Sequence, residues 1–376
     1  MPKGISNAAR LRPRGGQILC TRRFAHCVVE RVTRGSVVSA VSPNIAGILP
    51  WSREESEGDV ELCESACRVC RANGPHQVHH ARELMHGTRD RFDYFECASC
   101  GTVQIMTVPS PAMLERHYPK DYYSFAQKKK NALAQWLATQ RDRHVLGLWN
   151  VAGGLIGLLR MDPVLQVLAQ AGLAPDQRIL DVGCGAGRLL DRLARAGFRN
   201  VMGVDPFIEG DMHTAAGVSI RKAHLHEVHE TFDVIMFNHS LEHVPDPVAV
   251  LKDAVMRLAP AGAILVRVPT PSSEAWRIYR TDWVQLDAPR HIVLPSREGA
   301  SIMARQASLA VDDVIDDSGA FQFLGSERYR RDIPLHDGAD RELFSGEDIA
   351  RFARRAVELN AHHRGDQAMF VMRRPF

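Results

Sequence analysis

The sequence lacks the long apolar runs that mark membrane proteins. None of the apolar stretches in its 376 residues reaches about 18 consecutive positions, the minimum for a helix that crosses a bilayer. The longest candidate, residues 146–159, contains Asn150 and several glycines, which favours a buried or interfacial helix. We therefore expect no transmembrane segment and a cytoplasmic location.

Acidic side chains are almost absent from the first fifty residues, which hold eight Lys or Arg and one acid, Glu30. This segment has no helical or strand period, and Arg22-Arg23 is not followed by the apolar core of a secretory signal. We interpret residues 1–55 as a disordered or non-native basic tail. An organelle transit segment, or a start codon placed upstream of a native start near Trp51, are the alternatives. The rest of the chain is slightly acidic, so we do not expect nucleic-acid binding.

Cysteine is scarce, but four of the eight cysteines form two matched pairs. Cys67 and Cys70 are separated by two residues, and so are Cys97 and Cys100. Two such knuckles can present four thiolates to one tetrahedral zinc ion, and a closed shell of this kind makes the zinc structural. Reduced, unligated thiols are the alternative, and Cys63 could replace one ligand. Disulfides are not expected in a reducing cytosol.

The most informative motif is Asp-Val-Gly-Cys-Gly-Ala-Gly at residues 181–187, which lies between an apolar run and an amphipathic segment. Glycines at a tight strand-to-helix turn let the backbone approach a ligand closely. Asp205 ends the next apolar run, 24 positions after Asp181, where a ribose-binding carboxylate is expected. An α/β domain that binds some other nucleotide is the alternative. We interpret Cys184, inside the turn, as a small filler rather than a nucleophile.

Apolar runs and amphipathic segments alternate from residue 178 onward, which predicts an α/β fold with a mainly parallel sheet covered by helices. We expect strands at 178–182, 200–205, 218–222, 232–237, 263–268, 309–316 and 368–373, and helices at 187–196, 246–258, 296–307 and 346–360. Upstream, the pattern predicts two or three helices within 131–173, broken near Gly153-Gly154, and zinc-ribbon strands at 92–97 and 102–107. The expected domains are the tail at 1–55, a zinc-ribbon-like domain at 60–125, a helical linker or lid at 126–175 and a catalytic domain at 176–376.

Four segments resemble, in order, the motifs of class I S-adenosylmethionine-dependent methyltransferases. Residues 178–187 resemble their motif I, and Gly-Val-Asp-Pro at 203–206 resembles their acidic ribose loop. Residues 232–247 resemble the fourth strand and its loop, and 258–269 resemble the fifth strand, with Ala261 where glycine is common. The resemblance implies a Rossmann-like fold with a seven-stranded, mainly parallel sheet, an antiparallel last strand, helices on both faces, and S-adenosyl-L-methionine as cofactor.

The resemblance also implies roles for individual residues. The expected cofactor contacts are Asp181, Gly183 and Gly185 at the methionine and ribose end, Asp205 at the ribose hydroxyls, and Asn238, which with His239 faces the reaction centre. Many relatives hold the adenine amine with an acidic residue after the third strand. Here that region is Lys-Ala-His-Leu-His at 222–226, so the adenine contact stays open.

His243 with Glu242 is the candidate acid–base pair, because imidazole titrates near neutral pH. A loop-orienting role for His243 is the alternative, because Leu-Glu-His-Val recurs in methyltransferases with different substrates. His239 is a second catalytic candidate. Arg290 and His291 form a compact basic–imidazole pair that could hold an anionic substrate, and a capping or packing role for His291 is the alternative.

The cysteine module joined to this core, over residues 63–376, resembles bacterial methyltransferases with an N-terminal zinc-binding domain. Some of these act as C-methyltransferases on sugars. The resemblance implies C- or O-methylation of a small-molecule, sugar-nucleotide or glycan acceptor. Two rival hypotheses remain: a zinc-ribbon ribosomal-RNA methyltransferase, which the lack of an Arg/Lys-rich ribbon disfavours, and a non-catalytic cofactor-binding protein. The oligomeric state is not predicted.

Overall fold

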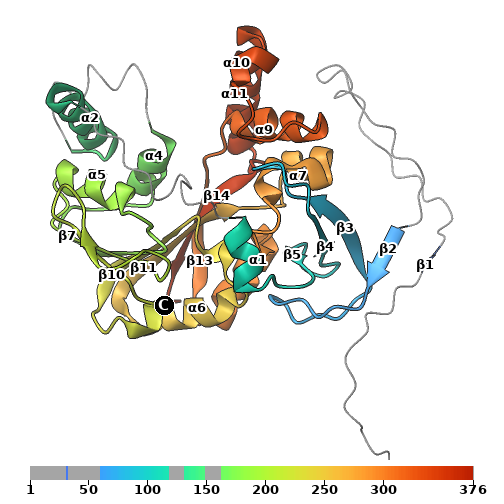
Figure 1. Ribbon diagram of the computed structural model, residues 1–376. Helices are drawn as coiled ribbons and strands as arrows, with labels where there is room; N and C mark the ends of the chain where they lie inside the picture. The colour runs from blue at the N-terminus through green and yellow to red at the C-terminus, as the bar shows by residue number, and fades with distance from the viewer. Residues whose placement is uncertain (1–30, 33–59, 118–130, 149–161, 376) are drawn as a thin grey trace, which may run out of the picture.

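The computed structural model describes residues 31–32, 60–117, 131–148 and 162–375, and these residues form two sheets with helices around the larger one (Figure 1). The expected tail lies outside the described residues, except for Arg31–Val32, which form strand β1. The break expected near Gly153-Gly154 also lies outside them. Among the described residues, no helix combines the length and apolarity needed to cross a membrane.

The larger sheet has eight strands in the order β13-β14-β11-β10-β6-β7-β9-β8. Their bounds are β6 Arg178–Val182, β7 Asn200–Val204, β8 Met212–His213, β9 Ser219–Arg221, β10 Phe232–Asn238, β11 Leu258–Pro269, β13 Ala310–Asp316 and β14 Gln367–Arg373. The central strands β11, β10, β6, β7 and β9 pair in parallel, and β14 is antiparallel to β11 and β13. The expected Rossmann-like fold is therefore confirmed, and each of the seven expected strands is present.

The expected strand count of seven is wrong, because β8 adds an eighth strand at the edge. A tight turn brings β8 back antiparallel to β9, with the Thr214 amide donating to the Val218 carbonyl. Gly217 completes this turn at φ +83°, a conformation that glycine adopts without steric cost. Strand β8 contributes only two paired residues, which are too few to show apolar alternation, so this strand could not be predicted from the sequence.

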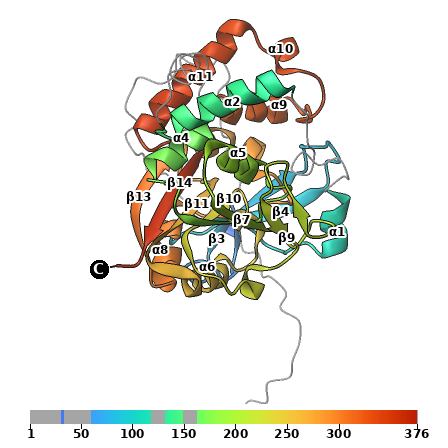
Figure 2. The ribbon, with the colours of Figure 1, turned by 90° about the vertical axis from the view of Figure 1, so that its left-hand side faces the viewer.

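Helices cover both faces of the larger sheet (Figure 2). Their bounds are α2 Ala132–Val145, α4 Pro163–Gln170, α5 Arg188–Ala196, α6 Pro247–Met256, α7 Glu274–Tyr279, α8 Arg297–Gln306, α9 Phe321–Arg330, α10 Asp340–Leu343 and α11 Gly346–Ala361. Short 3-10 turns lie at Leu225–Glu227, Leu241–His243, Arg280–Asp282 and Val284–Leu286. The four helices expected in the catalytic domain are confirmed, and Gly197 ends α5 in the left-handed conformation, as its position predicts.

Alternation along the central strand separates two apolar cores. Val234 and Met236 of β10 pack with α4 and α5 on one face, while Ile235 and Phe237 point to the opposite face. The second core continues from this face through α6 and α8 to the cysteine module. The module and the catalytic sheet are therefore joined by buried apolar contacts.

The smaller sheet contains the cysteine module and has the order β1-β2-β3-β4-β5-β12. Its strands are β2 Val60–Cys63, β3 His76–Arg82, β4 Arg91–Glu96, β5 Val103–Ile105 and β12 Val293–Leu294, and helix α1, Pro111–Arg116, follows β5. The two ribbon strands expected here correspond to β4 and β5. Strand β12 comes from the distant segment 293–294 and pairs antiparallel with β5. The catalytic part of the chain thus completes the ribbon sheet.

Candidate functional site

The glycine turn after β6 has the tight geometry that its sequence predicts. Gly183 has φ +74°, and its amide donates to the Val204 carbonyl at 2.8 Å. A Cβ on Gly183 would lie 2.5 Å from the Cβ of Ser240, whose hydroxyl donates to the Val182 carbonyl at 2.6 Å. The turn is therefore packed against the loop after β10, and only glycine fits without displacing that loop.

The turn and the carboxylate at the end of β7 hold each other in place. One Asp205 oxygen accepts from the Gly185 amide and the other from the Phe207 amide, each at 2.8 Å. Asp205 is buried, so these bonds fix the orientation of its carboxylate. Each carboxylate oxygen retains a second lone pair, which suits the two hydroxyls of a ribose.

Asp181 is the buried carboxyl group at the end of β6, and its Oδ1 has no hydrogen-bond partner among the described residues. Burial, together with the charge of Asp205, raises the pKa of Asp181 to about 8. A buried acceptor without a partner is costly. The arrangement therefore fits a ligand that brings a cationic donor, such as the amino group of a bound amino acid.

Asn238 ends β10 and is held by a residue that the sequence analysis missed. Arg267 of β11 donates to Asn238 Oδ1 at 3.1 Å and forms a buried ion pair with Asp317 at 2.6 Å. The only sequence signal was an arginine inside an otherwise apolar strand. Both strands end at the edge of the parallel sheet where ligands collect in folds of this kind.

His239, Glu242 and His243 lie together after β10. His239 has φ +54°, and its Nδ1 lies 3.2 Å from Glu242 Oε1. Burial alone would raise the pKa of Glu242, but the hydrogen bond from His239 and the charges of the neighbouring imidazoles lower it to about 2. Glu242 is therefore a buried carboxylate at neutral pH.

The structure adds His291 to this group. The ring centroids of His243 and His291 are 4.8 Å apart in an edge-to-face arrangement. His243 Nδ1 lies 2.9 Å from the Arg290 carbonyl, and His291 Nδ1 lies 2.7 Å from the Gln285 carbonyl. Because a carbonyl only accepts, each Nδ1 carries the hydrogen and each neutral ring keeps its lone pair at Nε2. Burial and the nearby His291 also lower the pKa of His243, which favours its neutral form.

Arg290 does not face an anionic substrate, and the hypothesis that it binds one is wrong. Its fully buried guanidinium pairs with Asp287 at 2.6 Å and with Glu83 of the ribbon at 3.0 Å. Burial opposes ionisation of Asp287, but the Arg290 charge holds the pKa of that carboxyl at about 2. Glu83 was also missed, because no sequence pattern links it to a partner 207 residues away.

A cavity of about 200 Å³ is lined by Arg267, whose guanidinium bonds to Asn238. Its lining combines the polar residues Gln285, Asp317, Gln322, Asp366 and Gln367 with the apolar residues Pro163, Val164 and Phe321. Burial raises the pKa of Asp366 to about 6. The buried Oε1 of Gln322 lacks a hydrogen-bond partner among the described residues. A larger cavity of about 280 Å³ lies near the start of β10, at the opposite edge of the sheet from the ligand-binding edge.

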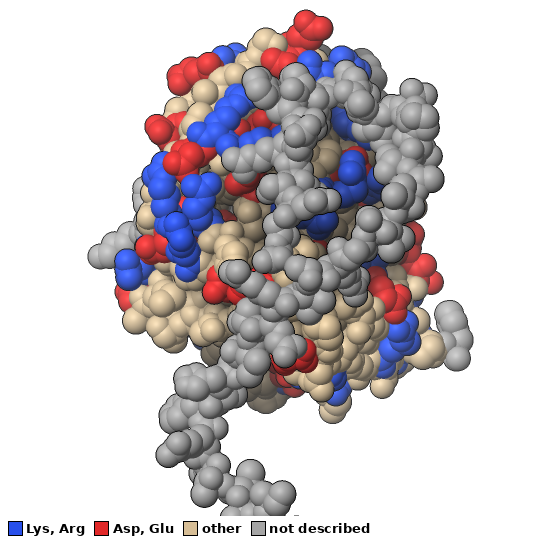
Figure 3. All heavy atoms as spheres, turned by 90° about the vertical axis from the view of Figure 1, so that its right-hand side faces the viewer, with Lys and Arg blue, Asp and Glu red and all other residues tan. Residues whose placement is uncertain are grey.

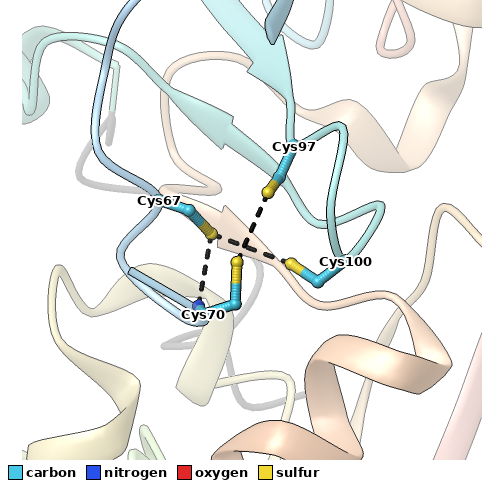
Figure 4. A group of neighbouring side chains, drawn as sticks. All are labelled: Cys67, Cys70, Cys97 and Cys100. Carbon is cyan, nitrogen blue, oxygen red and sulfur yellow. Dashed lines mark hydrogen bonds between the residues drawn. The ribbon is translucent and has the colours of Figure 1, made fainter. Parts of the chain in front are cut away.

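The structure brings Cys67, Cys70, Cys97 and Cys100 together, with their side chains directed at one centre (Figure 4). The four sulfur atoms lie within 4.8 Å of one another, with Cys67 and Cys100 3.7 Å apart and Cys70 and Cys97 3.5 Å apart. Zinc–sulfur bonds of about 2.3 Å in a tetrahedron place sulfur atoms about 3.8 Å apart. The donor set therefore fits zinc. Cys63 is buried outside this group.

Comparisons with known proteins agree with this geometry. A family described as "Methyltransferase domain" matches residues 157–313. The ubiquinone biosynthesis O-methyltransferase of Pseudomonas fluorescens (strain SBW25) is 32% identical over 158 residues, covering 37% of this chain and 67% of that protein. The protein of the same name from Serratia proteamaculans (strain 568) is 29% identical over 140 residues, covering 34% and 58%. The chain thus spans about two thirds or less of these curated relatives.

Solved structures give weaker similarities. An S-adenosylmethionine-dependent methyltransferase from Mesorhizobium loti has 16% identity and a TM-score of 0.38, covering 57% of this chain and 98% of that one. A cyclopropane synthase from Mycobacterium tuberculosis has 18% identity and a TM-score of 0.37, covering 57% and 87%.

The parallel sheet, the glycine turn and the paired carboxylates define an α/β enzyme that binds a nucleoside-containing cofactor at its strand ends. These features, together with the matches to the methyltransferase domain and to the Pseudomonas fluorescens protein, identify the family. The chain belongs to the class I S-adenosylmethionine-dependent methyltransferases. It is therefore an enzyme that uses S-adenosyl-L-methionine, as its motifs predict.

Proposed function

We propose that the protein transfers the methyl group of S-adenosylmethionine to a hydroxyl group of a small, polyhydroxylated acceptor, such as a sugar or glycan unit. The cavity lined by Arg267, which bonds to Asn238, carries this proposal. Its amides and carboxylates are accompanied by the apolar side chains of Pro163, Val164 and Phe321, and this mixture suits the polar edges and apolar faces of a sugar ring. The unpartnered, buried Oε1 of Gln322 calls for a donor from the acceptor.

On the cofactor side, we propose that Asp181, Gly183 and Gly185 line the methionine and ribose end, and that Asp205 accepts from the ribose hydroxyls. The backbone bonds that fix Asp205 support this role. We propose that Asn238 contacts the cofactor at the side that faces the cavity. Arg267 supports this placement, because it bonds to Asn238 and also lines the cavity. The sulfonium is already activated, so the protein chiefly aligns the acceptor oxygen with the methyl carbon.

On the acceptor side, the hydroxyl proton must leave as the carbon–oxygen bond forms. The lone pair at His243 Nε2 can accept it, because the Arg290 carbonyl holds the hydrogen at Nδ1. Glu242 would stabilise the imidazolium, and His239 would position Glu242 through its hydrogen bond. The names of the curated relatives, ubiquinone biosynthesis O-methyltransferases, favour oxygen over carbon as the methylated atom.

We also propose that Cys67, Cys70, Cys97 and Cys100 bind a structural zinc ion. Four protein ligands leave no position for water or substrate, so the ion would brace the ribbon rather than take part in methyl transfer. The ribbon in turn contacts the catalytic loop, since the Tyr94 hydroxyl donates to the His291 carbonyl at 2.8 Å. The domain boundaries at 60–125, 126–175 and 176–376 remain a proposal, and β12 shows that the ribbon sheet draws on the last of them.

A nucleic-acid substrate is disfavoured by the charge distribution. Over the described atoms of the ribbon-side face, basic and acidic side chains are interspersed (Figure 3). A protein that tracks a phosphate backbone needs a continuous basic surface. The zinc-ribbon RNA methyltransferase hypothesis therefore has no support on this face.

The test is transfer of labelled methyl from S-adenosylmethionine into a cell extract fractionated into nucleotide sugars and glycans, phenolic and lipid compounds, and RNA. Label in the sugar fraction is expected. Label confined to phenolic compounds or RNA would overturn the acceptor class, and cofactor binding without label in any fraction would favour a non-catalytic role.

With the acceptor identified, Gln322→Leu should raise its KM about 10-fold, as expected for about 1.4 kcal/mol of lost hydrogen bonding. The dissociation constant of S-adenosylhomocysteine should not change, because Gln322 lines the acceptor cavity and not the glycine turn. An unchanged KM would place the acceptor elsewhere.

A further inference from the structure

Glu242, His243 and His291 form a second cluster of metal-ligating side chains, far from the cysteines in sequence. Their ligand atoms all lie within 4.8 Å of one another. Glu242 and His243 belong to the 3-10 turn after β10, whereas His291 belongs to the segment before β12. The Ile292 amide donates to the Glu242 carbonyl at 2.7 Å, so the two segments are held together by the backbone as well.

Both imidazoles are oriented as metal-bound imidazoles usually are. Each directs its Nδ1 hydrogen at a backbone carbonyl, that of Arg290 for His243 and that of Gln285 for His291. Such bonds fix the tautomer and leave Nε2 as the ligand atom. The two rings therefore belong to one buried cluster of potential metal ligands.

The carboxylate between the rings is incompletely bonded. Glu242 is fully buried, and its Oε2 has no hydrogen-bond partner among the described residues. His291 Nε2 lies 3.9 Å from Glu242 Oε1 and 3.8 Å from Asp287 Oδ2, and both distances are too long for hydrogen bonds. A buried carboxylate oxygen without a donor is costly unless another cation meets it.

We propose that Glu242, His243 and His291 bind a divalent transition-metal cation. Two imidazoles and one carboxylate match the donor preference of such ions, and these three ligands, drawn from the described part of the chain, leave coordination positions open. Gln285 links this cluster to the cavity, because its carbonyl accepts from His291 Nδ1 and the residue also lines the cavity.

The role of this cation rests on the proposed function. The cation binds the acceptor hydroxyl and lowers its pKa, so that the proton passes to solvent. The acceptor oxygen then forms a bond to the methyl carbon as the carbon–sulfur bond breaks, and its electron pair stays on sulfur in S-adenosylhomocysteine. With the cation bound, His243 is a ligand and solvent takes the proton, so His243 is the general base only in the cation-free enzyme.

The experiment is titration of the full-length protein with Mn²⁺, followed by electron paramagnetic resonance of free and bound ion, without cofactor or acceptor. Mn²⁺ favours nitrogen and oxygen ligands over the thiolates of the cysteine cluster. One bound ion per chain is expected. His291→Gln and Glu242→Gln should each weaken binding at least about 10-fold, since even outer-shell changes weaken metal sites by that factor.

Two controls separate this site from its surroundings. His79→Gln removes another buried histidine beside a carboxylate, Glu96 at 3.5 Å, and should leave Mn²⁺ binding unchanged. Cys63→Ser, which alters a buried ribbon thiol outside both clusters, should also leave it unchanged. Circular dichroism of both ligand variants establishes that they are folded.

Saturable binding that survives both ligand substitutions, or no saturable binding below about 1 mM, would overturn the proposal. The Mn²⁺ titration needs no acceptor. If it shows a bound ion while the methyl-transfer assay places the label outside the sugar fraction, only the proposed function is contradicted.

Discussion

Arg290, next to His291 in the chain, donates a buried hydrogen bond of 3.0 Å to Glu83, which follows β3 of the ribbon and lies 207 residues earlier in the chain. The Glu83 carboxylate also accepts from the His86 and Thr88 amides, each at 2.9 Å. The ribbon therefore holds the segment that carries His291 through a buried ion pair, in addition to the β5–β12 pairing.

Glu83→Ala should lower the free energy of unfolding by about 3–5 kcal/mol, because it leaves the Arg290 charge buried with one partner fewer. Methyl transfer should fall too, since the Arg290 carbonyl holds His243. Chemical denaturation and initial rates measure the two effects. The control is Asp332→Ala, which breaks exposed pairs with Arg82 and Arg89 across the same boundary and should cost about 0–1 kcal/mol for each pair. Equal losses in both variants would contradict the prediction.

Asp181→Asn should stabilise the cofactor-free protein while weakening cofactor binding. The pKa of Asp181 is raised to about 8 in the folded protein, so the protein loses stability as pH rises from the ordinary aspartate value towards 8. The gain in unfolding free energy from the Asn substitution should be absent near pH 4. Between pH 4 and pH 8 it should grow by at most about 1.4 kcal/mol per pH unit. Thermal unfolding at several pH values, with calorimetry of S-adenosylmethionine binding, measures both. If Asp181→Asn is less stable than the unsubstituted protein at pH 8, the result would argue against a cofactor-binding role for Asp181.

Asp205→Asn should weaken S-adenosylmethionine binding by about 1–3 kcal/mol, because a neutral amide cannot replace charge-assisted hydrogen bonds to the ribose. Calorimetry measures the change. Glu209→Gln is the control, since Glu209 is an exposed acid on the same loop. Unchanged affinity in Asp205→Asn would refute the ribose role.

Gly183→Ala should abolish cofactor binding, because the new Cβ would lie 2.5 Å from Ser240 in a turn at φ +74°. Gly172→Ala is the matched control, with φ +81° but nothing within 4 Å of the new Cβ. It should cost about 1–2 kcal/mol of stability through its backbone alone and leave cofactor affinity intact. Similar binding by both variants would show that the close packing of the turn is not required.

Cys97→Ser should reduce the zinc content of the purified protein and its thermal stability, whereas Cys63→Ser should retain both. Both thiols are buried in the ribbon, but only Cys97 belongs to the cluster of four. Elemental analysis by mass spectrometry measures the metal. Full zinc content in Cys97→Ser would reject this ligand set.

The elements with strong periodicity were predictable from the sequence. The strand expected at 178–182 is β6, and Gly197 ends α5 as its position indicates. Less regular elements were not predictable. Helix α9, between β13 and β14, carries buried polar residues such as Gln322 and Arg328, and these interrupt the apolar periodicity that would indicate a helix. The cysteine pairs were found by their spacing, and the structure brings them together.

The fold class and the cofactor were predictable from the chain, because both depend on local signals: apolar runs that form parallel strands, and the glycine turn with the carboxylates at the ends of its two strands. The surroundings of the proposed acceptor site, in contrast, are assembled only in the tertiary structure. Glu83, Arg267 and His291 lie in separate segments, and no short-range pattern pairs them. They meet because β12 joins the ribbon sheet and β11 lies beside β10 in the larger one, and such long-range pairing is set by the packing of whole sheets.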